Sequence, residues 1–210
     1  MAKVIVKVAT PDHKKYAEEI CDLIAVSAQQ RGTGIALRSP EYIRLKIDEG
    51  QAIVAVSDNE LVGFCYIESW SNRQYVANSG LVVKQDFRSS GIAKRIKRIA
   101  FERSQNLFPN AKIFGLTTSL PVMKINSELG YIPVTYGELT NDELFWNGCQ
   151  SCVNYEILLS KNKSNCMCTA MQFDPHQSGK KRWDFVKKSK IYDRFMKMKK
   201  KRMTKKQFVL

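Results

Sequence analysis

The sequence has no hydrophobic run long enough to cross a membrane. No stretch approaches the ~18 consecutive apolar residues of a membrane helix, and the opening Met1-Ala2-Lys3-Val4 does not resemble a signal peptide. We therefore expect a soluble protein of the cytoplasm. Apolar residues nevertheless make up 44% of the 210 positions, which supports one well-packed domain with an appendage.

A disulfide framework is also missing. The chain has six cysteines, of which Cys21 and Cys65 stand alone in apolar surroundings, as is usual in a reducing compartment. The other four form two closely spaced pairs, Cys149 with Cys152 and Cys166 with Cys168. Four such thiols can enclose zinc tetrahedrally. We expect, however, that residues 153–159 form a strand in a hairpin that separates the two pairs, so buried, reduced thiols are the favoured interpretation and zinc is the alternative.

Acidic residues are scarce in the last part of the chain. Residues 180–210 hold 14 Lys and Arg but only Asp184 and Asp193, so they carry +12 of the net charge of +14. Residues 174–179 are typical of a linker. We therefore predict a domain over residues 1–173 and, over residues 174–210, a linker with a basic tail that is partly helical or disordered. Such a tail suits RNA, an anionic membrane surface or a partner groove, and a merely solvated tail is the alternative.

Two common phosphate-binding motifs are absent, G-x-x-x-x-G-K-S/T and G-x-G-x-x-G. Instead, the apolar run at residues 81–83 predicts a strand, and Ile92, Ile96 and Ile99 predict a helix after a polar turn. Gly91 stands where the turn becomes helix, and the first helical turn holds no carboxylate. Because a helix start has free amides and a partial positive charge, this junction can bind an anion, best a pyrophosphate.

The segment Arg88-Ser89-Ser90-Gly91-Ile92-Ala93, with Asp86 and Phe87 ahead of it, resembles the R-x-x-G-x-A/G acyl-CoA loop of the GNAT superfamily of N-acyltransferases. It departs from the usual pattern at Gln85, where proline is common, and at Ser89, often glycine. An ordinary turn between strand and helix is the alternative. The resemblance implies acetyl-CoA or succinyl-CoA as co-substrate. The residues expected to bind it are Leu81, Val82, Val83, Arg88, Ser89, Ser90, Gly91, Ile92, Ala93 and Asn126.

The remaining pattern agrees with this family. Strands are predicted at residues 3–8, 51–56, 61–70, 75–84, 112–117, 131–136 and 153–159, and helices at about 11–27, 40–49, 92–106 and 120–129. The order β-α-α-β-β-β-α-β-α-β-β is that of the GNAT fold over about residues 3–160. It implies a mixed α/β (α+β) fold whose central, mostly antiparallel sheet is flanked by helices.

The resemblance also implies roles for residues near the thioester. In GNAT enzymes the strand before the loop diverges from its neighbour, and its backbone pairs with the pantetheine arm. The backbone amide of Leu81 would then stabilise the oxyanion. We favour Glu68 as general base, with Asn78 nearby to hold a water. A partly exposed Glu68 at a strand end, without a catalytic role, is an equal alternative.

The usual proton donor of the family is missing. Many GNAT enzymes have a tyrosine four residues before the glycine of an L-G-F/Y motif, and here Leu129-Gly130-Tyr131 supplies the motif while Asn126 takes the tyrosine position. Tyr131, Tyr136 or water would therefore protonate the leaving thiolate, or it would leave unaided, because a thiol pKa of about 8.5 makes it a tolerable leaving group.

Residues 113–118 and 129–134 resemble the F-x-L-T-T…R-G-F-x-P-V stretch of N-acetylglutamate synthases, without the amino-acid-kinase-like domain that those enzymes often carry. Residues 145–155 resemble single-domain bacterial GNAT proteins linked to arginine synthesis. The resemblance implies the α-amine of glutamate or a related amino acid as acceptor, with Arg31 and Arg38 gripping its carboxylates. Solvated surface arginines are the alternative.

Two other functions stay open. One is an acyltransferase for peptides or proteins that is recruited through the basic tail. The other is a CoA-binding regulatory module without turnover. A homodimer is a possible assembly for any of these functions.

Overall fold

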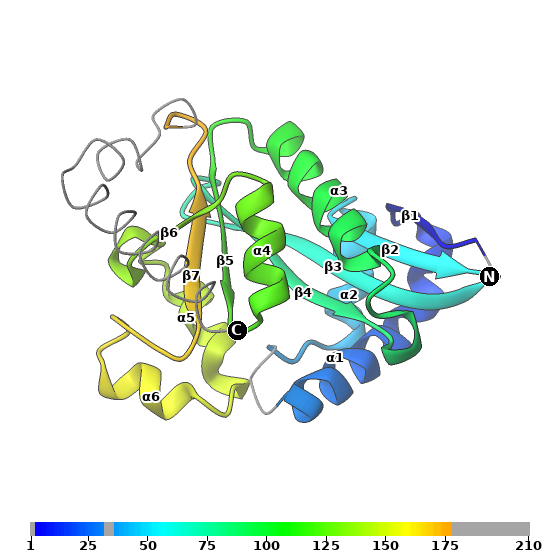
Figure 1. Cartoon of the computed structure of the whole chain (residues 1–210), viewed down its shortest axis with the longest axis horizontal. Helices are drawn as coiled ribbons and strands as arrows, with labels where there is room; N and C mark the ends of the chain where they lie inside the picture. The colour runs from blue at the N-terminus through cyan, green and yellow to red at the C-terminus, as the bar shows by residue number, and fades with distance from the viewer. Residues whose placement is uncertain (1–2, 32–35, 178–210) are drawn as a thin grey trace, which may run out of the picture. The chain divides into compact units, whose positions relative to one another are not determined.

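The computed structural model of the chain describes residues 3–31 and 36–177 (Figure 1). Contacts divide the chain into two units, Met1–Pro175 and His176–Leu210. The basic tail predicted over residues 180–210 lies outside the described residues, so its helical character and its partners stay predictions. None of the described helices is long and apolar enough to cross a bilayer.

The first unit is built on a mixed sheet with the strand order β1-β2-β3-β4-β5-β7-β6. All neighbours in it are antiparallel except β4 and β5, which are parallel. This confirms the expected mixed, mostly antiparallel sheet. The strands are β1 (Ile5–Val8), β2 (Ala52–Ser57), β3 (Glu60–Trp70), β4 (Tyr75–Val83), β5 (Lys112–Thr117), β6 (Ile132–Pro133) and β7 (Thr169–Phe173).

Helices cover both faces of this sheet. The α-helices are α1 (Ala17–Arg31), α2 (Pro40–Asp48), α3 (Ile92–Leu107), α4 (Leu120–Glu128), α5 (Glu143–Asn147) and α6 (Tyr155–Ser160). Short 3₁₀ segments are η1 (Pro11–Tyr16), η2 (Gln85–Phe87), η3 (Tyr136–Glu138) and η4 (Gly148–Ser151). The start of α2 follows the sequence signal, because the Ser39 side chain accepts a hydrogen bond from the Tyr42 amide and Pro40 opens the helix.

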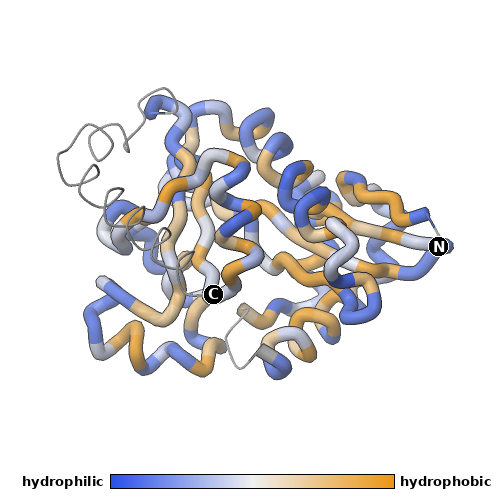
Figure 2. Tube along the Cα trace, viewed as in Figure 1, coloured by the Kyte–Doolittle hydropathy of each residue, from blue (hydrophilic) through white to orange (hydrophobic). Residues whose placement is uncertain are grey.

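Alternating residues of the central strands divide the core into two layers. Ile53 and Ala55 of β2 pack with the buried face of α3, while Ala52 and Val54 pack with α1 and α2 on the other face. Figure 2 shows the hydrophobic residues concentrated along these central strands. A third cluster, around Trp70, joins the end of the sheet to the segment that contains α5 and α6.

Two predicted strands differ in the structure. The segment predicted as a strand over residues 153–159 contains helix α6, and the last strand is β7. Its apolar run, Ile157 to Leu159, is too short to show a period, and only Leu158 is buried. The strand predicted over residues 131–136 is limited to Ile132–Pro133, because Thr135 and Glu138 form a capping box that starts a 3₁₀ turn.

Candidate active site

The two parallel strands in the middle of the sheet separate, as expected. The pairing of β4 with β5 is limited to Tyr75–Ala77 against Lys112–Phe114. Beyond Ala77, β4 continues to Val83, while β5 is hydrogen-bonded on its other side to β7. Figure 1 shows the two strands diverging. The divergence leaves one edge of β4 available from Asn78 onward, which an extended ligand can pair with.

A bulge in β4 lies at this open edge. The register with β3 shifts between the pairs Phe64–Val82 and Tyr66–Ser79, so that Gly80 and Leu81 lie opposite Cys65. Gly80 has a φ of +65°, and a Cβ atom there would lie 2.7 Å from the Tyr66 ring. Because both the dihedral angle and the contact exclude a side chain, the position requires glycine.

The loop after β4 ends at the start of α3 with Gly91 as N-cap, at a φ of +79°. No side chain of the described residues caps this helix, and its first turn contains no acidic residue. A Cβ atom at Gly91 would meet no atom within 4 Å, so the space in front of the helix start is open. The first-turn amides are therefore available to an anionic ligand.

Arg88 supports this loop from within. Its Nε donates to the Val83 carbonyl oxygen at 3.1 Å, and its Nη2 donates to Gln30 Oε1 at 3.3 Å. The guanidinium thus ties the loop to the end of β4 and to α1. Ser90 Oγ donates to the Phe87 carbonyl oxygen within the same loop. Residues 81–83 and 88–93, predicted as the CoA-binding residues, thus form one path from the open edge of β4 to the start of α3.

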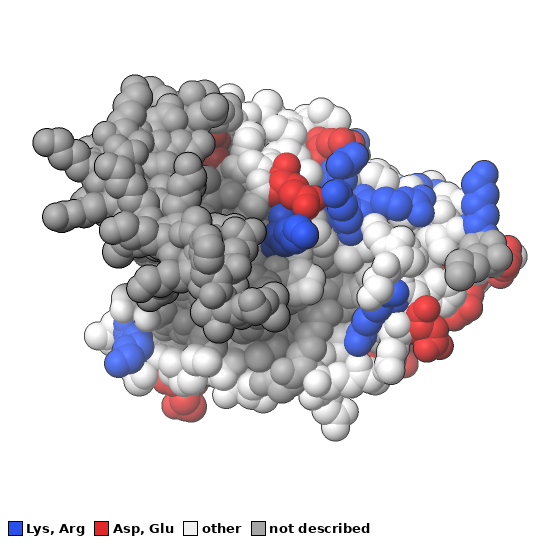
Figure 3. Space-filling view, in the orientation of Figure 1, with Lys and Arg blue, Asp and Glu red and all other residues white. Residues whose placement is uncertain are grey.

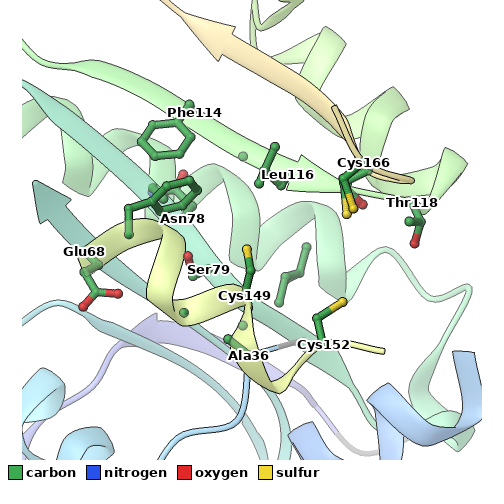
Figure 4. A pocket seen from close by; sticks show the side chains of 18 of the residues that line it. Ala36, Glu68, Asn78, Ser79, Phe114, Leu116, Thr118, Cys149, Cys152 and Cys166 are labelled. Carbon is green, nitrogen blue, oxygen red and sulfur yellow. The ribbon is translucent and has the colours of Figure 1, made fainter. Parts of the chain in front are cut away.

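A cavity of ≈ 190 Å³ lies where β4 and β5 separate. Its lining includes Glu68, Asn78 and Leu81, which the sequence predicts as catalytic residues, and also Arg38 and Asn126. Tyr131 is not among the lining residues, whereas Tyr136 is. The side chain of Arg31 is not described, so its acceptor-binding role stays a prediction. Figure 4 shows Glu68 at one end of the view and Cys166 at the other.

Glu68 and Arg38 form a charged pair in the cavity wall. Arg38 Nη2 lies 3.7 Å from Glu68 Oε2, and the Tyr42 hydroxyl donates to Glu68 Oε1. The Arg38 guanidinium also lies over the rings of Tyr42 and Tyr66. Glu68 Oε2 and Arg38 Nε are both buried without a hydrogen-bond partner among the described residues. Burial and the adjacent Glu68 carboxylate raise the pKa of Tyr42, which therefore stays a neutral donor.

Tyr131 and Asn78 belong to a buried hydrogen-bond network. The Tyr131 hydroxyl donates to Asn78 Oδ1 at 3.1 Å, and Asn78 Nδ2 donates to Ser104 Oγ at 2.7 Å. Burial raises the pKa of Tyr131 well above its ordinary value. Since its hydroxyl already has a partner and Tyr131 does not line the cavity, we assign it to holding Asn78 in place.

Lys97 is the residue in the cavity that sequence reasoning missed. This side chain of α3 is only 2% exposed, and its Nζ donates to the Asn78 carbonyl oxygen at 3.3 Å. Its Nζ also lies 5.4 Å from the centre of the Tyr131 ring. Burial lowers the pKa of Lys97 to about 8. Its position, four residues before the buried Phe101, places it on the apolar face of α3, and this signal could have revealed it.

Asn126 of α4 lies near Gly115, as does Lys97, and lines the same cavity. Its side chain is 1% exposed, its Nδ2 is 3.9 Å from Met171 Sδ, and its Oδ1 has no hydrogen-bond partner among the described residues. A Cβ atom on Gly115 would lie 3.8 Å from Asn126 Nδ2 and 4.0 Å from Lys97 Nζ. Gly115 therefore leaves the space between these two polar groups open.

The four paired cysteines all line the same cavity. All six cysteines are free thiols, and burial raises the pKa of Cys149 to about 11 and that of Cys168 to about 12. The predicted hairpin that would separate the pairs is not formed, since α6 takes its place. Within residues 3–31 and 36–177, no group of three or more His, Cys, Asp or Glu is arranged to hold a metal ion. The raised pKa values keep Cys149 and Cys168 as neutral thiols near neutral pH.

Comparison with known proteins finds one matching family and several solved structures with a similar fold. Residues 29–121 match the acetyltransferase (GNAT) family. A comparison with curated proteins gives no match. Among solved structures, the chain is similar to N-acetylglutamate synthase from Neisseria gonorrhoeae complexed with coenzyme A and N-acetyl-glutamate, with a TM-score of 0.59 and 17% identity. That match covers 84% of this chain but only 36% of the synthase chain.

Two further structures match over most of both chains. Rv2747 from Mycobacterium tuberculosis, in complex with CoA and NLQ, has a TM-score of 0.57 and 15% identity, and the match covers 81% of this chain and 98% of that one. The protein yncA from Salmonella typhimurium, with its cofactor acetyl-CoA, has a TM-score of 0.57 and 9% identity, with coverage of 83% and 95%. At these identities the likeness shows the fold.

Proposed function

We propose that the chain transfers an acyl group from acyl-CoA to the α-amine of a small amino acid, because residues 29–121 match the acetyltransferase (GNAT) family. The observation that carries the proposal is the opening between β4 and β5, which connects the uncapped start of α3 with a cavity that contains a carboxylate. Acyl-CoA needs a binding site for its diphosphate and an open strand edge that can pair with its pantetheine arm. The solved neighbours that hold CoA or acetyl-CoA support the same co-substrate.

Several residues fit acyl-CoA as substrate. The amides at the start of α3 would accept the diphosphate, because Gly91 leaves the approach open. The free edge of β4 would pair with the pantetheine arm, with the backbone amide of Leu81 as donor to the thioester oxygen. Val82, Val83, Ile92 and Ala93 would fix the backbone at both ends of this path by packing into the core.

The acceptor would be held by the Arg38–Glu68 pair. An α-amino acid carries a carboxylate and an ammonium group side by side, and these match the guanidinium and the carboxylate in the cavity wall. The buried, unpartnered Arg38 Nε and Glu68 Oε2 gain partners when such a zwitterion binds. Glu68 would then take the proton from the acceptor amine as general base, and Tyr42 would hold the carboxylate in place.

Glutamate is the acceptor that we test first. The neighbour from Neisseria gonorrhoeae was solved with N-acetyl-glutamate, and residues 113–118 and 129–134 of this chain resemble those of such synthases. This acceptor would place the enzyme in arginine biosynthesis. The cytoplasm is the compartment that we propose, because all six cysteines are free thiols.

The test is a steady-state assay of thiol release with acetyl-CoA and succinyl-CoA against a panel of acceptors. Glutamate, its amide glutamine, other amino acids, and peptides with free N-termini or lysines are compared at equal concentration. We expect turnover with a free α-amino acid and little turnover with peptides. Turnover with peptides alone would refute the small acceptor, and CoA binding without turnover of any acceptor would refute the enzyme assignment.

A further inference from the structure

The cavity contains a buried cation that the proposed acceptor site does not use. Lys97 is 2% exposed, and its amine lines the cavity where β4 and β5 separate. Its contacts are the Asn78 carbonyl oxygen and the face of the Tyr131 ring, and none of the described carboxylates pairs with it. A buried ammonium without an acidic partner is costly, which suggests that it acts on a ligand.

The residues around Lys97 leave one side of its amine open. Asn126 and Lys97 flank Gly115, which has no side chain to fill the space between them. Asn126 stands at the position where this family commonly has its proton-donating tyrosine, and an amide cannot give up a proton near neutral pH. The chain therefore lacks an acid at that position but has an ammonium group beside it.

The other two hydroxyl candidates are occupied. Tyr131 does not line the cavity, and its hydroxyl donates to Asn78 Oδ1. Tyr136 lines the cavity, but its hydroxyl donates to the Cys168 carbonyl oxygen at 2.9 Å. Burial raises the pKa of both tyrosines.

We propose that the Lys97 ammonium protonates the CoA thiolate as the tetrahedral intermediate breaks down. The proposal rests on the acyl transfer inferred above. The bond between the acceptor nitrogen and the acyl carbon has formed by then, and the carbon–sulfur bond breaks with its electron pair going to sulfur. Lys97 gives one proton to that sulfur, so CoA leaves as a neutral thiol. The acceptor ammonium loses one proton before it attacks and a second as the amide forms; Glu68 takes each in turn and passes it to water, and Lys97 regains one proton from water.

The acidity of Lys97 suits this step. Its pKa of about 8 lies close to the pKa of about 8.5 of a free thiol, and proton transfer is most effective between groups of matched acidity. The titratable groups that face Lys97 are Cys65 of β3 and Tyr131, which precedes β6. Burial raises the pKa of Cys65 to about 11, so both neighbours stay neutral while Lys97 titrates.

The experiment compares the pH dependence of kcat in the wild type and in K97M and K97R, with saturating acetyl-CoA and acceptor. In the wild type we expect kcat to fall above the pKa of Lys97. The kcat of K97M should be about 10²-fold lower than that of the wild type, and it should no longer decrease above this pH. K97R keeps a cation that does not release its proton, so it should be as slow as K97M. Small primary amines added to K97A should restore part of the rate.

Controls separate this role from folding and from binding. R98M changes an exposed basic residue of the same helix beyond its first turn and should match the wild type, while calorimetry should show CoA bound equally by all variants. A fast K97R, or an unchanged fall of kcat in K97M, would overturn the proposal. So would a K97M that loses succinyl-CoA turnover but keeps acetyl-CoA turnover, because Lys97 would then bind the acyl group. An inactive wild type would refute the enzyme assignment itself.

Discussion

At the scale of single residues, Glu68 matters because its carboxylate is fixed in position while its hydrogen-bonding capacity is only partly used. Tyr42 donates to one oxygen, Arg38 lies 3.7 Å from the other, and that second oxygen has no hydrogen bond within the described part of the chain. We expect E68Q to keep the Tyr42 contact and to lower kcat by about 10²-fold or more, with a small change in the KM for acyl-CoA.

Steady-state kinetics at several pH values check this expectation. E60Q is the matched control, because Glu60 begins the same strand but is exposed and pairs with Lys84. Wild-type kcat in E68Q would show that Glu68 only orients Arg38. A higher KM for the acceptor at constant kcat would assign it to binding.

Lys97 also predicts a pH dependence of stability. The pKa of Lys97 falls from 10.5, the ordinary value of an exposed lysine, to about 8 in the folded protein, so the unfolded chain binds more protons between these two pH values. The contribution of Lys97 to the free energy of unfolding therefore increases by roughly 3 kcal/mol as pH rises from about 8 to about 10.5. Below pH 8 both states are protonated, and the full cost of burying the charge remains.

The measurement is urea unfolding of the wild type and K97M from pH 7 to pH 10. We expect K97M to be the more stable variant at pH 7, because methionine fills a similar space without a charge. The difference between the two should shrink as pH rises. Taking the difference removes the contribution of buried tyrosines and cysteines, which both variants share. A difference that does not change with pH would contradict the lowered pKa of Lys97.

At the scale of elements, β4, its loop and α3 form the unit on which the proposed binding of acyl-CoA depends. Because α3 begins at Gly91 without a cap, the substrate itself can complete the helix start. We expect G91D to lower the melting temperature slightly, because the φ of +79° strains any side chain and the favourable carboxylate at the helix start offsets only part of that cost, and to weaken CoA binding by repelling its phosphates. The KM for acetyl-CoA should rise by about tenfold or more, equivalent to about 1.4 kcal/mol.

G91N is the matched control for this substitution. Asparagine has nearly the same shape as aspartate and also tolerates a positive φ, but it carries no charge. G91N should therefore bind CoA more tightly than G91D in calorimetry at low salt, and added salt should narrow the gap. Equal loss in both variants would mean that the side chain blocks the loop by its size.

The same unit shows what the sequence could predict. Strand β4, the loop and α3 are visible from residues 81–106, because the β-branched run, Gly91 and the helical spacing are local signals. The segment between α5 and β7 was predicted wrongly, since its apolar run is short and its burial depends on contacts with Trp70 and Phe114. The pair of Arg38 with Glu68 depends on packing between distant elements, so no local pattern reveals it, whereas the helical spacing of α3 already places Lys97 on the buried face.

At the scale of the whole molecule, the net positive charge is concentrated in residues 180–210 and not in the first unit. The first unit, Met1–Pro175, contains the sheet and the cavity, whereas 14 Lys and Arg belong to residues 180–210. Figure 3 shows basic and acidic side chains interspersed on the described surface of this face.

Truncation tests this division, and the structure dictates where the chain can be cut. Strand β7 lies between β5 and β6 and hydrogen-bonds to both, so it is an internal strand although it comes late in the sequence. We expect a chain that ends at Gly179 to keep β7, its melting temperature and its turnover of acetyl-CoA. A chain that ends at Asn165 loses β7 along with Cys166 and Cys168 of the cavity wall, and it should not fold.

Circular dichroism melts and the thiol-release assay distinguish these outcomes. If the chain ending at Gly179 kept its melting temperature but lost turnover, residues 180–210 would contribute to the active site, and the tail could not be treated as an appendage. If it lost both, the tail would be part of the fold. β7 hydrogen-bonds to the side of β5 that faces away from β4. Only the chain that ends at Asn165 should therefore lose the opening between β4 and β5, and with it any binding of CoA.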